Sequence, residues 1–154
     1  PQRSRNAPIE SAPANVVRGS GELILVVDDE QNIRALLRDT LVRDHYKVIT
    51  AQDGVEATAI FAANPATKLI ITDLDMPLMD GINLGRVLRR MKPGVKIVVS
   101  TGLTGRGGGD KRHADIEALG VSAVLTKPYT GEKLLRVVHA ALADVGVSAN
   151  PRQG

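Results

Sequence analysis

The feature that most constrains the fold of this chain is a set of four apolar runs, each ending in a polar side chain. The runs are LILVVDDE, LIITDLDMPLMDG, IVVSTG and VLTKPY, which begin at residues 23, 69, 97 and 124. Short apolar runs bounded by turn residues are typical of buried strands. In an open parallel sheet, ligands bind at the carboxyl ends of the strands. The pattern therefore predicts a metal-dependent phosphoryl-transfer site built from Asp28, Asp29, Asp73, Thr101 and Lys127.

Strands and amphipathic helices alternate between the two ends of the chain. We predict strands at residues 23–28, 46–51, 68–73, 95–101 and 122–126, and helices after each of them, the last four at about 54–64, 81–90, 110–119 and 130–143. Such alternation implies a parallel sheet with helices on both faces, and right-handed crossovers favour the strand order 2-1-3-4-5. The predicted fold class is α/β, a flavodoxin-like doubly wound (βα)5 fold.

The first and last helices show apolar stripes at helical spacing. Their predicted core-facing residues are Ile33, Leu36, Leu37 and Leu41 in the first helix, and Leu134, Leu135, Val138 and Leu142 in the last. Thr130 is the predicted N-cap of the last helix.

The two ends of the chain differ from the segment between them. Residues 1–21 are rich in Pro, Ser, Asn, Ala and Gly and lack apolar periodicity, which predicts a disordered linker. We expect one domain at residues 22–143, followed by a tail at 144–154.

Charge and composition exclude several function classes. The sequence pI is about 9.5, yet residues 22–143 carry 16 Lys plus Arg against 15 Asp plus Glu, and aromatic residues make up only 2% of the chain. Nucleic-acid binding is therefore not expected. The absence of cysteine excludes disulfides and thiolate zinc sites. No apolar run is long enough for a membrane span, so we expect a cytoplasmic protein without direct membrane contact.

The carboxylates carry the predicted chemistry. Asp28 and Asp29 could cap the following helix, but capping needs only one of two adjacent carboxylates. Clustered carboxylates repel each other, and a divalent cation relieves that cost. Mg²⁺ prefers such oxygen ligands. An aspartate such as Asp73 can attack phosphorus and form an acyl phosphate.

The four strings, in this order, resemble the receiver domain of bacterial two-component response regulators, from about residue 22 to residue 142. The resemblance implies that Asp73 is the phosphoacceptor. It implies Mg²⁺ as cofactor, bound directly by Asp29 and through water by Asp28, with Asp73 and the backbone carbonyl of Asp75 completing the metal site. The Asp75 side chain adds a carboxylate near the site, which could alter the lifetime of the phosphate.

The resemblance assigns the remaining site residues in the same way. Thr101 would bond a phosphoryl oxygen, Gly102 would leave room for the donor, and Lys127 would stabilise the transferred charge. Ser100 is a rival to Thr101, but its side chain is expected on the other face of the strand. The peptide bond before Pro128 is usually cis in the family.

Two features depart from the family pattern. The switch position, usually aromatic, is Val124 here, and the loop GLTGRGGGDK that begins at Gly102 is longer than usual. We expect the signal to leave through this glycine-rich loop, mobile before phosphorylation and more ordered after it, and through the helix that begins near residue 110.

The resemblance also implies protein partners. A histidine kinase or a histidine phosphotransfer domain would donate the phosphate, docking at the first helix, and no external substrate would be turned over. The RGSGE segment before the first strand resembles the joint before a C-terminal receiver of a hybrid sensor histidine kinase. A free-standing single-domain regulator is the alternative. The sequence leaves the oligomeric state open, and a homodimer is compatible with it.

Two alternatives come from other classes of protein. Asp73-Leu74-Asp75 is similar to the D-x-D motif of haloacid-dehalogenase-type phosphatases, but the acidic pair comes first here rather than last, and there is no room for a cap domain. Residues 105–111 are glycine-rich like a P-loop, but Asp110 stands where that motif requires glycine.

Overall fold

The protein forms a three-layer α/β structure around a parallel five-stranded sheet. The structure is a computed structural model, and it describes residues 18–102 and 109–143. Its strands are β2 (Leu23–Val27), β3 (Lys47–Ala51), β4 (Thr67–Asp73), β5 (Lys96–Thr101) and β6 (Ala123–Thr126). Neighbouring strands run parallel in the order β3-β2-β4-β5-β6. This is the predicted order 2-1-3-4-5, and the predicted fold class is confirmed.

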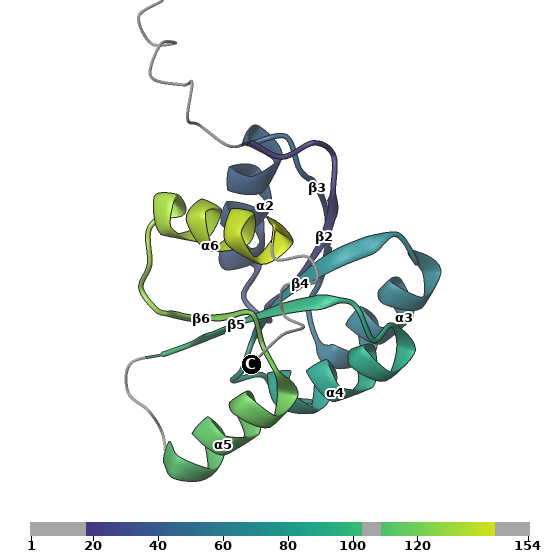
Figure 1. Ribbon diagram of the computed structural model, residues 1–154, viewed down its shortest axis with the longest axis vertical. Coiled ribbons are helices and arrows are strands. Elements are labelled where there is room, and N and C mark those ends of the chain that lie inside the picture. Colours follow the sequence, from purple (N-terminus) through teal and green to yellow (C-terminus); the bar gives the residue numbers. More distant parts are fainter. Residues whose placement is uncertain (1–17, 103–108, 144–154) are drawn as a thin grey trace, which may run out of the picture.

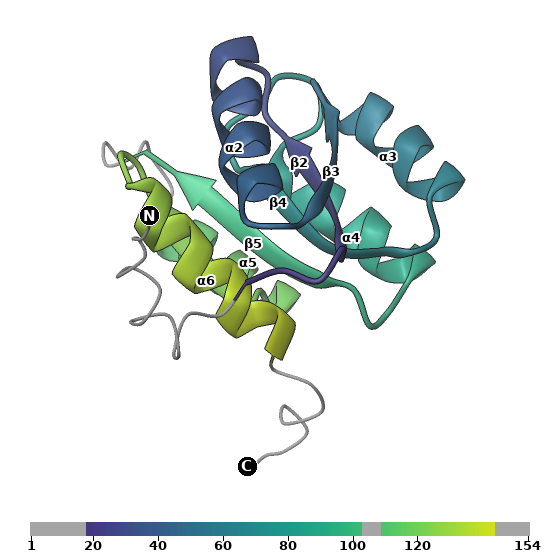
Figure 2. The ribbon, with the colours of Figure 1, turned by 90° about the horizontal axis from the view of Figure 1, so that it is seen from above.

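A helix follows each strand and covers one face of the sheet. The helices are α2 (Gln31–Arg43), α3 (Gly54–Ala63), α4 (Gly81–Met91), α5 (Gly109–Leu119) and α6 (Gly131–Ala143). Helices α2 and α6 lie on one face, and α3, α4 and α5 lie on the other (Figures 1 and 2). Helices α2 to α5 each run back across the sheet and connect one strand to the next, so all five strands run in the same direction and their carboxyl ends lie at the same edge.

Alternation along the strands divides the core into two clusters. In β2, Ile24 and Val26 pack toward α2 and α6, whereas Leu25 and Val27 pack toward the other three helices. The central strand β4 is buried on both faces, as expected of a strand between two layers of helices. The aliphatic strands thus fix the edge of the sheet that carries the polar residues.

The ends of the elements differ from the predictions by at most one residue, but one core assignment was wrong. Leu37 and Leu41 of α2 are buried, but Leu36 is 61% exposed. A helix advances about 100° per residue, so Leu36 lies at the margin of the apolar stripe that Leu37 and Leu41 define. In α6, Leu134 and Val138 are buried as predicted, while Leu135 and Leu142 are partly buried. The predicted cap is confirmed, because the Lys133 N–H donates to Thr130 Oγ1 over 3.0 Å.

The described chain begins four residues before the predicted domain boundary. The N–H of Gly19 donates to the Asp44 carbonyl over 2.8 Å, and the N–H of Gly21 donates to the His45 carbonyl over 2.9 Å. Residues 18–21 therefore pack onto the domain. Residues 1–17 of the predicted linker at 1–21, the tail at 144–154 and the loop residues 103–108 lie outside the described residues. Across the described residues, the longest helices have 13 residues, and none has the length and apolar character of a membrane span.

Candidate functional site

Three carboxylates meet at the carboxyl edge of the sheet. Asp28 follows β2, Asp29 follows Asp28, and Asp73 ends β4, and one oxygen of each lies within 4.8 Å of the others. Asp28 is 2% exposed and Asp73 is 5% exposed, whereas Asp29 faces the solvent. The sequence prediction thus placed these residues together correctly. Two buried carboxylates and one solvent-exposed carboxylate thus form a single acidic cluster.

The turn after β4 holds Asp73 in place through its own backbone. The N–H of Asp75 donates to Asp73 Oδ1 over 3.0 Å, and the N–H of Leu74 donates to the Ser100 carbonyl over 2.9 Å. Gly81 starts α4 directly against this turn. A Cβ at Gly81 would lie 2.5 Å from the Asp73 carbonyl oxygen and 2.9 Å from Leu74 Cα, so only glycine fits there. Gly81, the last residue of the second string, is therefore a steric requirement of the site.

The acidic pair does not cap the following helix with its side chains. The N-cap of α2 is Glu30, which makes no side-chain capping bond. Asp28 Oδ1 instead accepts the N–H of Glu30 over 2.9 Å, and the Asp28 carbonyl accepts a hydrogen bond from Arg34 Nη1 over 2.7 Å. Both bonds orient Asp28 inward. The capping interpretation of this pair is therefore wrong, and its carboxylates remain directed at the site.

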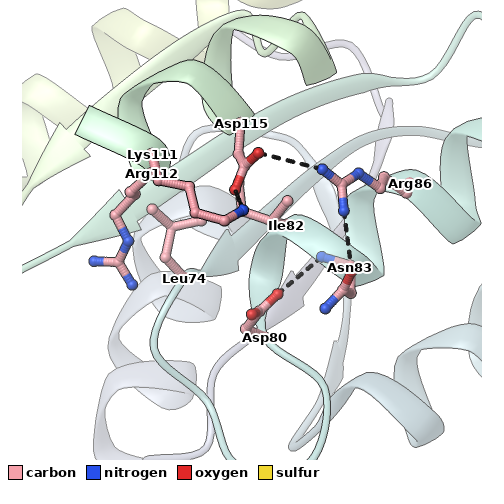
Figure 3. Close-up of a pocket in the computed structure, with 8 residues that line it drawn as sticks. All are labelled: Leu74, Asp80, Ile82, Asn83, Arg86, Lys111, Arg112 and Asp115. Carbon is pink, nitrogen blue, oxygen red and sulfur yellow. Dashed lines mark hydrogen bonds and ion pairs between the residues drawn. The ribbon is translucent and has the colours of Figure 1, made fainter. Parts of the chain in front are cut away.

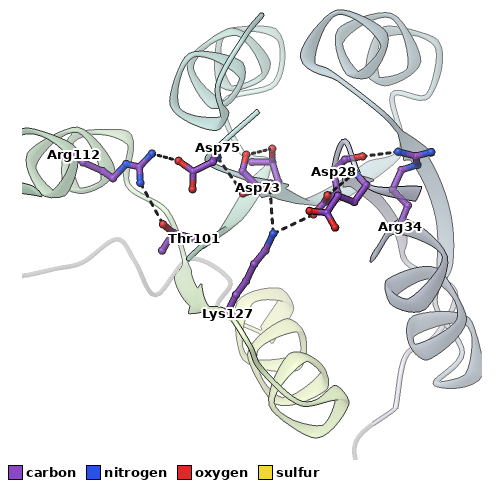
Figure 4. A network of polar contacts seen from close by, with 9 residues as sticks. Asp28, Arg34, Asp73, Asp75, Thr101, Arg112 and Lys127 are labelled. Atoms are coloured by element: carbon purple, nitrogen blue, oxygen red, sulfur yellow. Dashed lines mark hydrogen bonds and ion pairs between the residues drawn. The ribbon is translucent and has the colours of Figure 1, made fainter. Parts of the chain in front are cut away.

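Lys127 lies between the two buried carboxylates (Figure 4). Its Nζ is 3.2 Å from Asp73 Oδ2 and 3.6 Å from Asp28 Oδ2. The N–H of Lys127 donates to the Thr101 carbonyl over 2.8 Å, so pairing beyond the end of β6 fixes the position of the side chain. The Lys127–Pro128 peptide bond is cis, the isomer that the resemblance implies.

Thr101 brings a hydroxyl to the same edge from β5. Its side chain is partly exposed, while the rival Ser100 is 2% exposed and lies beside Asp73 in the sheet register. Gly102 follows directly and is also partly exposed. The structure thus gives Thr101 access to the site from the solvent side. Val124, the predicted switch position, lies on the edge strand β6 opposite Val99 and is 40% exposed.

Sequence reasoning missed one residue of the site, Arg112. This residue is in the first half of α5, and its Nη1 donates to Thr101 Oγ1 over 3.3 Å. Its Nη2 forms an ion pair with Asp75 Oδ1 at 2.5 Å. The sequence contained a weak indication of this role. Two cations, Lys111 and Arg112, lie in the first turn of this helix, where the macrodipole disfavours positive charge, so a nearby carboxylate partner was to be expected.

The electrostatics reflect crowding of negative charge. Burial raises the pKa of Asp28; the Glu30 N–H and Lys127 oppose this, and Asp73 and Asp29 add to it. Burial alone would lower the pKa of Lys127, but the attraction of Asp28 and Asp73 raises it. Burial also raises the pKa of Tyr129 to about 12. Lys127 is therefore charged at neutral pH, and Asp28 resists ionisation.

The donor set fits a hard divalent cation. Three carboxylate oxygens from Asp28, Asp29 and Asp73 lie close enough to share one ion, and one of these groups faces water. Mg²⁺ prefers oxygen ligands and keeps several of its waters, which suits a site that is open on one side. Burial, with a smaller contribution from Asp73 and Asp29, raises the pKa of Asp28, and a divalent cation at this cluster would offset that cost.

Comparisons with known proteins agree with this arrangement. The family model of the response regulator receiver domain matches residues 24–139. The chain is 37% identical over 128 residues to the response regulator MprA of Mycobacterium sp. (strain KMS), covering 83% of this chain and 54% of that protein. The chain therefore spans about half the length of the curated relatives it matches.

Solved structures show the same fold. A response regulator receiver domain protein from Clostridium thermocellum superposes with a TM-score of 0.73 at 28% identity, covering 82% of this chain and 98% of that one. The chemotaxis protein CheY4 of Vibrio cholerae gives a TM-score of 0.71 at 28% identity, covering 79% and 99% of the two chains.

Proposed function

The chain belongs to the response regulator receiver domain family of two-component systems, and on that premise we propose that Asp73 accepts a phosphoryl group in a Mg²⁺-dependent reaction. The observation that carries this proposal is the position of Asp73. Its buried carboxylate ends the central strand, shares a cluster with Asp28 and Asp29, and lies 3.2 Å from Lys127.

The reaction is the transfer of a phosphoryl group from a phosphohistidine to the aspartate. A carboxylate oxygen of Asp73 attacks the phosphorus, the bond from phosphorus to the histidine nitrogen breaks, and that nitrogen keeps the electron pair. The product is an aspartyl phosphate. Asp75 N–H and Lys127 hold the two oxygens of Asp73 and orient them for attack.

The other residues of the site stabilise the transferred charge. Mg²⁺ would be held by Asp28, Asp29, Asp73 and the carbonyl of Asp75, and it would neutralise the charge of the phosphoryl oxygens. Lys127 supplies a second positive charge, and the Thr101 hydroxyl can donate a hydrogen bond to a phosphoryl oxygen. Preorganised donors of this kind are the main source of catalysis in phosphoryl transfer.

The donor protein would dock on α2 beside the site. An apolar pocket of about 250 Å³ lies between α2 and the segment after β6, lined by Ile33, Leu36, Leu37, Lys127, Pro128 and Tyr129. Leu36, which the core does not use, stands exposed at this pocket. An exposed leucine next to the phosphoacceptor suits contact with an amphipathic helix that carries the phosphohistidine.

Two parent contexts follow from the sequence: a hybrid sensor histidine kinase and a free-standing regulator. The curated relatives reported above are named response regulators, which favours a regulator. The sequence of the full-length gene product decides between them. The haloacid-dehalogenase alternative loses its support, because the Asp75 side chain points toward Arg112 instead of toward Asp73 (Figure 4).

Intact mass spectrometry after incubation with acetyl phosphate and Mg²⁺ tests the proposal. The wild-type protein should gain one phosphoryl group, and Asp73→Asn should gain none. Asp39→Asn, an exposed aspartate of α2, is the matched control and should behave as the wild type. Equal labelling of Asp73→Asn and the wild type would refute the assignment of Asp73.

A further inference from the structure

Arg112 reaches into the phosphorylation site from a helix that the reaction described above does not use. Its guanidinium donates with one nitrogen to Thr101 Oγ1 at 3.3 Å and pairs through the other with Asp75 Oδ1 (Figure 4). The side chain is 28% exposed, so it is packed along the surface of the site. Both partners flank Asp73, one on β5 and one in the turn after β4.

The packing of α5 keeps Arg112 in this position. Leu119, near the end of the helix, contacts Gly85 of α4 so closely that a Cβ there would lie 2.6 Å from Leu119 Cδ2. Arg89 Nη1 donates to the Leu119 carbonyl over 2.9 Å, and Arg86 pairs with Asp115 at 3.5 Å. A polar pocket of about 310 Å³ lies between the two helices, and both Lys111 and Arg112 belong to its lining (Figure 3).

The charge balance of the site explains what Arg112 contributes. Asp28, Asp29 and Asp73 are the candidate side-chain ligands of the metal. Asp75 is not part of that cluster, and in the proposed function it would offer only its backbone carbonyl. The Asp75 carboxylate is thus a fourth negative charge beside the incoming phosphoryl group, without a role in binding the metal. Its pairing with Arg112 removes the repulsion that a free carboxylate would exert on a phosphoryl donor.

The hydrogen bond from Arg112 to Thr101 orients the Thr101 hydroxyl toward the phosphoryl group. A hydroxyl group has one donor and two acceptor positions. Arg112 can only donate, so its bond occupies one acceptor position of Thr101 and leaves the hydroxyl proton free. That proton can then be donated to a phosphoryl oxygen on Asp73. A single guanidinium therefore neutralises one side chain and orients another.

We propose that Arg112 is a positioning residue for phosphoryl transfer, which acts by neutralising Asp75 and by orienting the Thr101 hydroxyl. This inference rests on the proposed role of Asp73 as phosphoacceptor. A lysine at this position would supply the positive charge, but it lacks the planar guanidinium whose two nitrogens bind Asp75 and Thr101 at the same time. Arg112→Lys should therefore retain only part of the effect.

The test is a double-mutant cycle on the rate of phosphorylation by acetyl phosphate at saturating Mg²⁺. Arg112→Ala should be slower than the wild type by about five- to tenfold, the effect of one partly solvated charge near the reacting group. Adding Asp75→Asn to Arg112→Ala should restore part of the rate, because the unpaired carboxylate is gone while the Thr101 hydroxyl still lacks its donor from Arg112. Lys111→Ala removes a cation from the same turn of α5 without touching the site, and should leave the rate unchanged.

A second measurement separates this role from a merely structural one. Arg112→Ala should bind Mg²⁺ at least as tightly as the wild type, because removing a cation favours a divalent cation nearby. Slower phosphorylation with undiminished Mg²⁺ affinity and rescue by Asp75→Asn supports the proposal. A wild-type rate in Arg112→Ala, or a double variant as slow as the single one, overturns it. Failure of the wild type to take up phosphate would instead refute the role of Asp73.

Discussion

Replacing Lys127 with methionine should destabilise the metal-free protein at neutral pH. Lys127 Nζ lies 3.2 Å from Asp73 Oδ2 and 3.6 Å from Asp28 Oδ2, and the two carboxylate side chains are 6% and 2% exposed. Methionine has a similar length and keeps the apolar stem, so the substitution removes the charge with little change in packing. Both buried carboxylates then lose their closest cation.

The magnitude follows from the burial of the three groups. Removing one partner of a buried ion pair costs about 3–5 kcal/mol, whereas exposed pairs contribute about 0–1 kcal/mol. Lys127 is 27% exposed, so solvent screens part of its interaction with the carboxylates. We therefore expect a loss of about 2–3 kcal/mol in the free energy of unfolding. For a domain of this size, that loss lowers the melting temperature by roughly 10 °C.

Mg²⁺ should recover much of this loss, because it supplies positive charge to the same carboxylates. At a concentration ten times its dissociation constant, a ligand adds about 1.4 kcal/mol by mass action. The variant should also bind Mg²⁺ more tightly than the wild type, since it lacks the repulsion from Lys127. The difference in stability between the two proteins should then narrow as Mg²⁺ rises.

The loss of unfolding free energy caused by Lys127→Met should also be smaller in mildly acidic solution. The pKa of Lys127 is raised, so its stabilising charge is fully present below the unfolded-state pKa and is lost only as the pH rises through the folded-state value. The pKa of Asp28 is raised as well, so its ionisation costs stability as the pH rises from about 4 through the folded-state value. Without Lys127 that pKa rises further, and protonating Asp28 then relieves the variant more than the wild type.

Urea unfolding with and without Mg²⁺, at neutral pH and at about pH 4–5, measures these effects. Lys133→Met, an exposed lysine of α6, is the control and should change stability by less than about 0.5 kcal/mol. Asp29→Ala should lose the stabilisation by Mg²⁺. The reasoning fails if Lys127→Met costs less than about 0.5 kcal/mol, or if its loss is the same at every Mg²⁺ concentration.

Two further predictions concern signal output and docking. Beryllofluoride, a mimic of the phosphoryl group, should increase the hydrogen-exchange protection of α5 (Gly109–Leu119). The reason is that Arg112 links α5 to Thr101, whereas Val124 has no aromatic ring that could rotate inward. Protection changes confined to α6 (Gly131–Ala143) would contradict this route. Leu36→Asp should slow phosphorylation by a histidine kinase that accepts the wild type, but not by acetyl phosphate, because it alters only the docking pocket on α2. Val42→Asp, also exposed on α2, is its control, and equal slowing by both substitutions would exclude a specific role of Leu36.

Much of the fold could be predicted from local patterns. The apolar strands and the Thr130 cap are set by interactions within a few residues, and the predicted strands and the last four helices form within one residue of their expected ends. The exposure of Leu36 was the exception. Periodicity places a residue on a side of a helix, but only the partner elements determine how wide the covered stripe is.

The contacts of Arg112 could not be predicted, because they join segments far apart in the chain. Arg112 meets Asp75, 37 residues away, and Thr101, 11 residues away across the glycine-rich loop. No short motif encodes such a meeting. It depends on how α5 packs against α4, which the contact between Gly85 and Leu119 sets.

The sequence by itself determined the parallel sheet, its strand order and the carboxylates, hydroxyl and lysine at its carboxyl edge. The physical reason is that strand-terminal residues of a parallel sheet share one edge whatever the details of packing. Only the tertiary structure decided that Glu30, and not the acidic pair, is the N-cap residue of α2. It also decided that Lys127 lies between Asp28 and Asp73, and that Arg112 forms an ion pair with Asp75. Side-chain direction and charge pairing arise only when all the elements are packed together.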